Sequence, residues 1–158
     1  MAELTPLDEK LAEVLGLAQA AQEATTKVAG MEGADEYRER LEQMKQEAEE
    51  TEQRTDELVD TLDGKKTAIR EKAAETKSEA KEMMQTYLAE EEEALDGFEF
   101  LTMAEAAELG HWEIVKKMAD TTGEKQVTYL ADWAVGVQRK HVETVRETSL
   151  ELAAAEVS

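Results

Sequence analysis

Two histidines in this sequence lie where a helical protein could hold a metal ion or a proton in its interior. His111 follows Glu108 by three residues, and this spacing puts an imidazole and a carboxylate on the same face of a helix. His141 lies in a later segment, three residues after Gln138. Imidazole nitrogens and carboxylate oxygens bind divalent first-row metals. We therefore take Glu108, His111 and His141 as the centre of a candidate site on the inner faces of two helices.

Three more carboxylates extend this candidate site, and they lie at the edges of the inner faces. Glu105 precedes Glu108 by about one helical turn. Glu47 and Glu50 belong to an earlier, strongly acidic segment. The predicted metal ligands are Glu108, His111, His141, Glu105, Glu47 and Glu50. The expected cofactor is iron or another divalent metal, with no organic cofactor. The sequence assigns no catalytic residue, so whether the protein is an enzyme stays open.

Long helices must position these residues, because the composition favours helices over sheets. The chain has 158 residues with 1 Pro and 8 Gly, too few turn residues for a β-sandwich or an α/β enzyme. Apolar and small residues recur at steps of three and four, which indicates amphipathic helices. Met83, Met84, Met103 and Met118 fit this pattern as core residues. The expected helices cover about 6–29, 35–63, 67–89, 93–119 and 124–152.

The lengths of the connections predict how these helices pair. The joins near 30–34 and 120–123 are short, so each links two antiparallel neighbours. The segment 64–92 is long enough to cross from one end of a bundle to the other. We therefore expect one all-α domain over 1–158. In it, two antiparallel helical hairpins form a four-helix bundle, joined by a long crossover that carries a short fifth helix. An up-and-down array of five helices is the alternative.

The hairpins and the Glu108-x-x-His111 spacing resemble the ferritin-like superfamily, whose di-iron members use one Glu on each of two helices and Glu-x-x-His on the other two. Segments 37–52 and 106–114 are similar to the bacterial stress-associated YciE/YciF-type ferritin-like proteins. In that family an acidic helix, a crossover helix and a helix with a His-aromatic-Glu triplet follow in order, and the triplet here is His111-Trp112-Glu113. The resemblance implies a ferritin-like fold, a stress response or iron handling, and Fe(II) oxidation if the site is redox-active.

The sequence departs from the di-iron pattern on three helices. Segment 35–63 has no His, Gln138 stands where the pattern has Glu, and segment 6–29 offers only Glu13 and Glu23, both off the inner face. A buried carboxylate still needs a partner, either a metal ion or a hydrogen-bonded His, unless the helix is rotated so that the carboxylate reaches solvent. A single-metal site, an asymmetric site and a metal-free layer therefore stay open. The alternative function is a non-catalytic helical interaction protein whose buried Glu–His layer sets the register of the bundle.

Charge and composition narrow the expected partners and location. The chain has 38 Asp+Glu against 18 Lys+Arg, and the net charge of -20 repels the phosphates of nucleic acids. No apolar run approaches the roughly 20 residues of a membrane span, and the N-terminus lacks the pattern of a signal peptide. We therefore expect a cytoplasmic protein that binds neither nucleic acid nor membrane. Metal ions and a second copy in a homodimer are the partners that the sequence allows.

Overall fold

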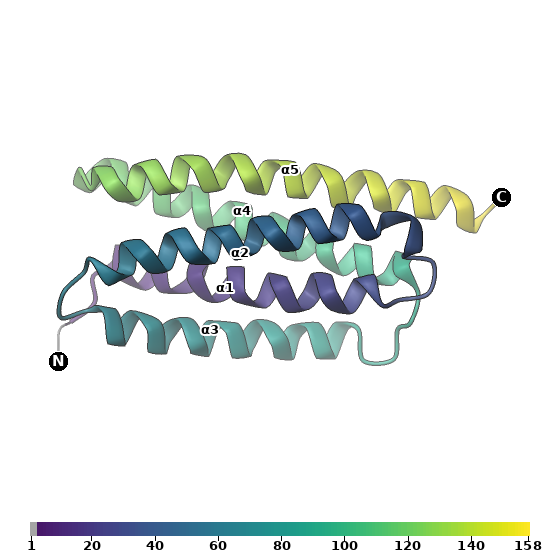
Figure 1. Ribbon diagram of the computed structural model, residues 1–158, viewed down its shortest axis with the longest axis horizontal. Coiled ribbons are helices and arrows are strands. Elements are labelled where there is room, and N and C mark those ends of the chain that lie inside the picture. Colours follow the sequence, from purple (N-terminus) through teal and green to yellow (C-terminus); the bar gives the residue numbers. More distant parts are fainter. Residues whose placement is uncertain (1–2) are drawn as a thin grey trace.

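The computed structural model describes residues 3–158 and is helical over most of that length (Figure 1). Its elements are α1 (Pro6–Ala29), the short 3-10 helix η1 (Asp35–Tyr37), α2 (Arg38–Asp60), α3 (Lys66–Tyr87), α4 (Ala94–Thr122) and α5 (Lys125–Glu156). The all-α class predicted from the composition is confirmed for the described residues. The last helix continues past the expected end near 152 because three consecutive alanines, 153–155, are strong helix formers.

Four helices surround a common core, and α3 lies beside them. α1 packs against α2 and α4, while α5 packs against α4 and α2. α3 packs mainly against α1. Figure 1 shows that the chain reverses direction at each connection, so α2 and α4 run one way while α1 and α5 run the other. With 22 residues, α3 is shorter than α1, α2 and α4, and it lies close to the expected range of 67–89.

The close approach of α3 to α1 depends on Gly16. A Cβ atom built on Gly16 would collide with the backbone carbonyl oxygen of Ala73 and would lie 2.9 Å from Cβ of Thr76. A backbone atom cannot swing away as a side chain can. Gly16 therefore lets the two helices pack at a distance that no larger residue permits.

We expect Gly16→Ala to destabilise the protein by about 1–3 kcal/mol, because an overpacked helix contact must move apart. The matched control is Gly136→Ala in α5, where an added Cβ meets no described atom within 4 Å. That change should stabilise the protein by about 0.5–1 kcal/mol through helix propensity alone. Urea denaturation of both variants measures the two effects. If the two variants change the free energy of unfolding in the same direction, the close packing assigned to Gly16 is contradicted.

The start of α1 is fixed by a reciprocal cap that also holds the turn before α3. The backbone N–H of Asp8 donates to Thr5 Oγ1 at 3.1 Å, and the backbone N–H of Thr5 donates to Asp8 Oδ2 at 2.9 Å. Lys65 Nζ donates to the same Asp8 oxygen at 2.8 Å. Burial raises the pKa of Asp8, but the hydrogen bonds from Lys65 and Thr5 outweigh it, so the pKa is lowered.

Asp8→Ala should cost about 1–2 kcal/mol of stability, because it removes one half of the cap and the partner of Lys65. Since the folded-state pKa of Asp8 is lowered, its contribution is present above the ordinary value of 3.8 and is lost as the pH falls through the folded-state pKa. Glu9→Ala is the control, since Glu9 is an exposed acid in the same helical turn. Thermal melting at pH 7 tests the pair, and equal losses would reduce the role of Asp8 to its charge alone.

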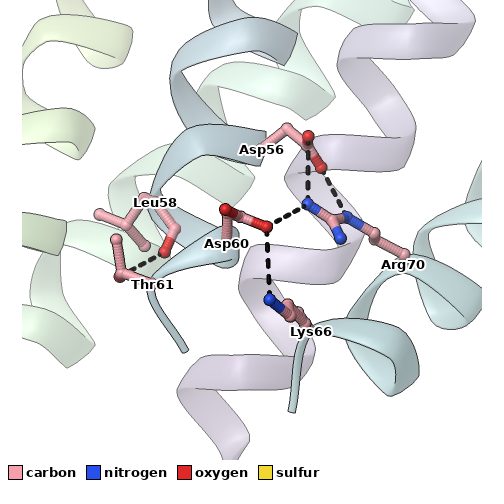
Figure 2. Close-up of polar contacts among 6 residues, drawn as sticks. All are labelled: Asp56, Leu58, Asp60, Thr61, Lys66 and Arg70. Carbon is pink, nitrogen blue, oxygen red and sulfur yellow. Dashed lines mark hydrogen bonds and ion pairs between the residues drawn. The ribbon is translucent and has the colours of Figure 1, made fainter. Parts of the chain in front are cut away.

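Ion pairs also link the end of α2 to the first turns of α3 (Figure 2). Arg70 donates to both carboxylate oxygens of Asp56, at 2.9 and 3.2 Å, and to Asp60 Oδ1 at 3.3 Å. Lys66 Nζ lies 3.6 Å from the same Asp60 oxygen, and Thr61 Oγ1 donates to the carbonyl of Leu58 at 2.6 Å. These contacts join the end of α2 to the first turns of α3 across the connecting turn.

The apolar core is divided into two main clusters along the bundle. One cluster includes Leu41, Phe98, Leu101 and Val145, and the other includes Leu11, Trp112, Val115 and Ala131. On α4 and α5 the stretch between the clusters contains Glu105, Glu108 and His141. The polar residues of the candidate site therefore lie between two apolar clusters. None of the helices in residues 3–158 combines the length and apolarity that a membrane crossing requires.

Candidate functional site

His141 is the centre of the polar region and is almost fully buried, with 2 % of its surface exposed. Its Nε2 atom lies 2.9 Å from Glu47 Oε1 of α2 in hydrogen-bonding geometry. Its Nδ1 atom lies 3.0 Å from Glu105 Oε1 of α4. The Nδ1 contact is close enough for an ion pair, but Nδ1 has no aligned hydrogen bond to any described residue. The imidazole is thus held between carboxylates from two other helices.

Glu105 and Glu108 form the second half of the site on α4, and both are buried. Their three-residue spacing places the two carboxyl groups on one face of the helix. Burial, the charge of Glu105 and a hydrogen bond to Glu105 raise the pKa of Glu108 well above its ordinary value. Glu108 therefore keeps its proton to a higher pH than an exposed glutamate does, in a hydrogen bond with Glu105. We call Glu47, Glu105, Glu108 and His141 the Glu/His layer.

The charges of the Glu/His layer depend on the protonation of His141. Burial lowers the pKa of His141, but the contacts and charges of Glu105 and Glu47 outweigh burial, so the pKa is raised. When His141 is protonated, its imidazolium faces the carboxyl groups of Glu47 and Glu105. Protons bound to His141 and Glu108 thus limit the charge that the bundle has to bury.

Small and neutral residues make room for the Glu/His layer. Ala18 and Ala21 are among the buried residues near the middle of α1. On α2, Thr51 donates its hydroxyl to the carbonyl of Glu47 at 2.8 Å, so it satisfies itself locally. On α5, Gln138 lies one turn before His141 and is buried, and its Nε2 atom has no hydrogen-bond partner among the described residues. Gln138 adds an unpaired donor to this region.

Two of the six predicted ligands lie outside the layer. The side chain of His111 is 34 % exposed, and its Nδ1 atom lies 3.6 Å from Glu13 Oε2 of α1. Glu50 is half-exposed and accepts a hydrogen bond from Arg54 on the same helix at 3.1 Å. The structure thus brings together Glu47, Glu105, Glu108 and His141, and it places His111 and Glu50 in other contacts.

The buried face of α4 explains why His111 lies elsewhere. Its buried residues follow steps of three and four through Phe98, Leu101, Glu105, Glu108 and Trp112. The side chain that continues this series after Glu108 is Trp112, which is fully buried, rather than His111. Placing His111 on the inner face was therefore wrong by one residue. The signal that identifies Glu105 is its position seven residues after Phe98 and seven before Trp112, in the middle of an aromatic series.

The described side chains do not surround a ready-made metal position. In residues 3–158, no group of three His, Asp or Glu side chains is arranged so that it could hold a metal ion. The donor types in the Glu/His layer nevertheless suit a divalent metal, because three carboxylates and one imidazole are present. Metal binding would require the protons and the ion pairs of the layer to give way.

Comparison with known proteins gives no family to which the chain can be assigned. No protein-family model, curated protein or solved structure matches the sequence or the fold. The function must therefore be argued from the residues themselves.

Proposed function

We propose that the chain is a ferritin-like four-helix bundle whose Glu/His layer binds one divalent first-row metal ion. The directions of the helices support the fold proposal. α1 and α2 form one antiparallel hairpin, α4 and α5 form the other, and α3 carries the chain back between them (Figure 1). This is the order of two hairpins joined by one crossover that characterises ferritin-like bundles.

The observation that supports metal binding is the meeting of four potential ligands from three helices at one level, three of them buried and Glu47 partly exposed. A protein rarely buries several ionisable groups together, because removing each from water costs several kcal/mol before pairing. Here His141, Glu105 and Glu108 are each less than 5 % exposed. We expect these three to hold the metal after their side chains rearrange, because the structure does not arrange them around one position. Glu47 would accept the hydrogen bond of Nε2 and so orient the ring, as outer carboxylates do for metal-bound histidines.

Protons occupy the donors that the metal would use, and this gives the proposal a second consequence. Metal ligands must lose their protons, so binding should release protons and tighten as the pH rises. Co²⁺ is a suitable probe because its visible absorption reports the ligands and geometry around the ion. Equilibrium dialysis followed by elemental analysis, with Zn²⁺, Mn²⁺ and anaerobic Fe²⁺ in parallel, measures the stoichiometry.

The experiment compares the wild type with His141→Ala, Glu108→Gln and His111→Ala. We expect about one equivalent of metal in the wild type and in His111→Ala, and at least a tenfold loss of affinity in the other two. His111→Ala is the matched control, because it removes the other histidine at a partly exposed position. Circular dichroism establishes that each variant is helical. Retention of metal by His141→Ala and Glu108→Gln, or no retention by the wild type, would refute the proposal.

A second candidate function is favoured because the ionisable groups of the Glu/His layer already pair with one another. His141 has a carboxylate beside each ring nitrogen, and Glu108 carries a proton toward Glu105. Such a layer can act without metal as a device that fixes the register of the helices, in a non-catalytic protein that binds other macromolecules. Thermal melting with and without a chelator separates the two functions. A metal that binds only the folded protein raises the melting temperature, and a metal-free layer leaves it unchanged.

A further inference from the structure

A cavity of about 190 Å³ lies between α1, α3 and α4. Its walls are almost wholly apolar and come mostly from alanine, leucine, methionine and phenylalanine side chains. Glu105 and Glu108 also line it, so the cavity borders the Glu/His layer. We refer to it below as the α3 cavity, because α3 supplies the wall that lies outside the four-helix core.

The α3 cavity is a recess that reaches the core rather than a flat apolar surface. Its inner wall includes Ala24, Met84 and Leu101, all buried. Its outer wall includes Met83 and Met103, whose surfaces are 68 % and 52 % exposed. The prediction that Met83 and Met103 are core residues was therefore wrong. The buried residues of α3 are Ile69, Ala73 and Met84, and Met83 is not one of them. Met103 is likewise not among the buried residues of α4.

The size and lining of the α3 cavity define the molecule that would fill it. An enclosed apolar cavity of roughly 150 Å³ binds benzene or xenon. The α3 cavity is of similar size but opens to solvent beside Met83 and Met103, so a guest would displace water that finds few hydrogen-bond partners on its walls. The unbranched methionine side chains can adjust to the shape of a guest. We propose that the α3 cavity binds a small uncharged apolar molecule, of about the size of benzene or toluene.

Charges around the α3 cavity argue against charged ligands. At its edge Glu23 lies 3.7 Å from Lys77 Nζ and 3.9 Å from Lys81 Nζ, so these basic groups already have an acidic partner. A carboxylate would also meet the net charge of -20. An ammonium group would be attracted by that charge and by Glu23, whose Oε2 atom is buried without a hydrogen-bond partner among the described residues, but it would lose its hydration against the apolar walls. A neutral hydrocarbon meets neither penalty. The proposal does not depend on metal binding by the Glu/His layer.

The test uses toluene as the probe and ¹³C-labelled methionine methyl groups as reporters, with a chelator present throughout. Saturable shifts are expected for Met83, Met84 and Met103, which line the cavity, but not for Met44, which lies outside it. Benzoate and benzylammonium should produce no saturable shift at the same concentrations. Equal shifts at Met44, saturable binding of the charged analogues, or no saturation up to the solubility of toluene would each overturn the proposal.

Two variants of α3 separate filling of the cavity from general damage to the helix. Ala80→Phe places a ring at a lining position and should weaken toluene binding at least tenfold. Ala74→Phe makes the same change at an exposed position of α3 and should leave binding unchanged. Circular dichroism checks that both remain helical, and Ala104→Leu, on the α4 wall, replaces Ala80→Phe if the latter unfolds. Unchanged binding in the filled variant would overturn the assignment.

Sedimentation at several protein concentrations tests for another occupant. A second copy of the chain could insert a side chain into the same recess. We expect the mass to be the same in the wild type and in Ala80→Phe. A wild-type dimer that fails to bind toluene, and that dissociates in Ala80→Phe, would assign the cavity to the second copy and overturn the small-molecule proposal.

Discussion

His141→Ala is expected to reduce the free energy of unfolding by about 3–5 kcal/mol at neutral pH in the presence of a chelator. The imidazolium is the only basic group that the structure places within 3.0 Å of both Glu47 and Glu105, among the described residues. Its removal leaves the buried carboxylate of Glu105 without a counter-charge, while the partly exposed Glu47 keeps Lys140 Nζ at 3.7 Å. The change also opens a space between helices α2, α4 and α5. A loss of this size is a large part of the 5–15 kcal/mol by which domains are usually stable.

The same substitution at the other histidine provides the contrast. His111 is partly exposed and its contact with Glu13 is 3.6 Å, so His111→Ala should change stability by less than about 1 kcal/mol. Urea denaturation followed by circular dichroism measures both variants under identical conditions. If the two losses are equal, the buried ion pairs of His141 do not carry the stability assigned to them. A triple change of His141, Glu105 and Glu108 to leucine should recover much of the loss, because apolar residues remove the unpaired charges as well.

The helices could be predicted from the sequence because each satisfies several local rules at once. Thr5, Pro6 and Asp8 mark the start of α1 through cap chemistry that acts over three residues. Gly123, with a positive φ of 75°, marks the end of α4 in the same local way. Such signals do not depend on which helices pack together, so the sequence alone contains them.

The candidate site could be predicted only in part, because side-chain orientation depends on how a helix is rotated against its neighbours. A helix turns 100° per residue, so an error of one residue moves a side chain from the interior to the edge. The inner position predicted for His111 is occupied by Trp112 in the structure, and His111 lies outside the layer. Glu47 and Glu105 were expected at the edges of their helices, and their meeting with His141 is a tertiary contact that no local rule encodes. Gly16 was not singled out, since its role becomes visible only when α3 lies against α1.

The Glu/His layer and the α3 cavity share two residues, and this connects the two proposals physically. Glu105 and Glu108 contact the layer on one side and border the cavity on the other. A guest in the cavity would lie against these two side chains, whose positions a bound metal would also fix. A bound guest should therefore change the affinity of the layer for metal, and metal should change the affinity for the guest by the same factor. Measuring toluene affinity with and without Co²⁺ would show whether the two sites are coupled.

We also expect the metal-free protein to lose stability as the pH rises above about 6.5. The pKa of His141 is raised on folding, so its contribution is fully present below the ordinary value of 6.5 and is lost as the pH rises through the folded-state pKa. The pKa of Glu108 is also raised, so above 4.5 the folded protein binds more protons than the unfolded chain. Both groups therefore act in the same direction. Each proton that differs between the states changes stability by about 1.4 kcal/mol per pH unit.

Glu108→Gln isolates the proton of Glu108 from the other titrating groups. Glutamine keeps the size of the acid and stays neutral at every pH, so the variant should lose less stability than the wild type on the way to alkaline pH. Urea midpoints between pH 5 and 9, with a chelator present, measure the two curves. Subtracting them cancels the repulsion among surface charges, which both proteins share. Parallel curves, or a wild-type stability that rises over this range, would show that Glu108 does not keep its proton in the folded state. With a divalent metal present, the trend should reverse for the wild type alone, because the metal replaces the protons whose loss destabilises the metal-free layer.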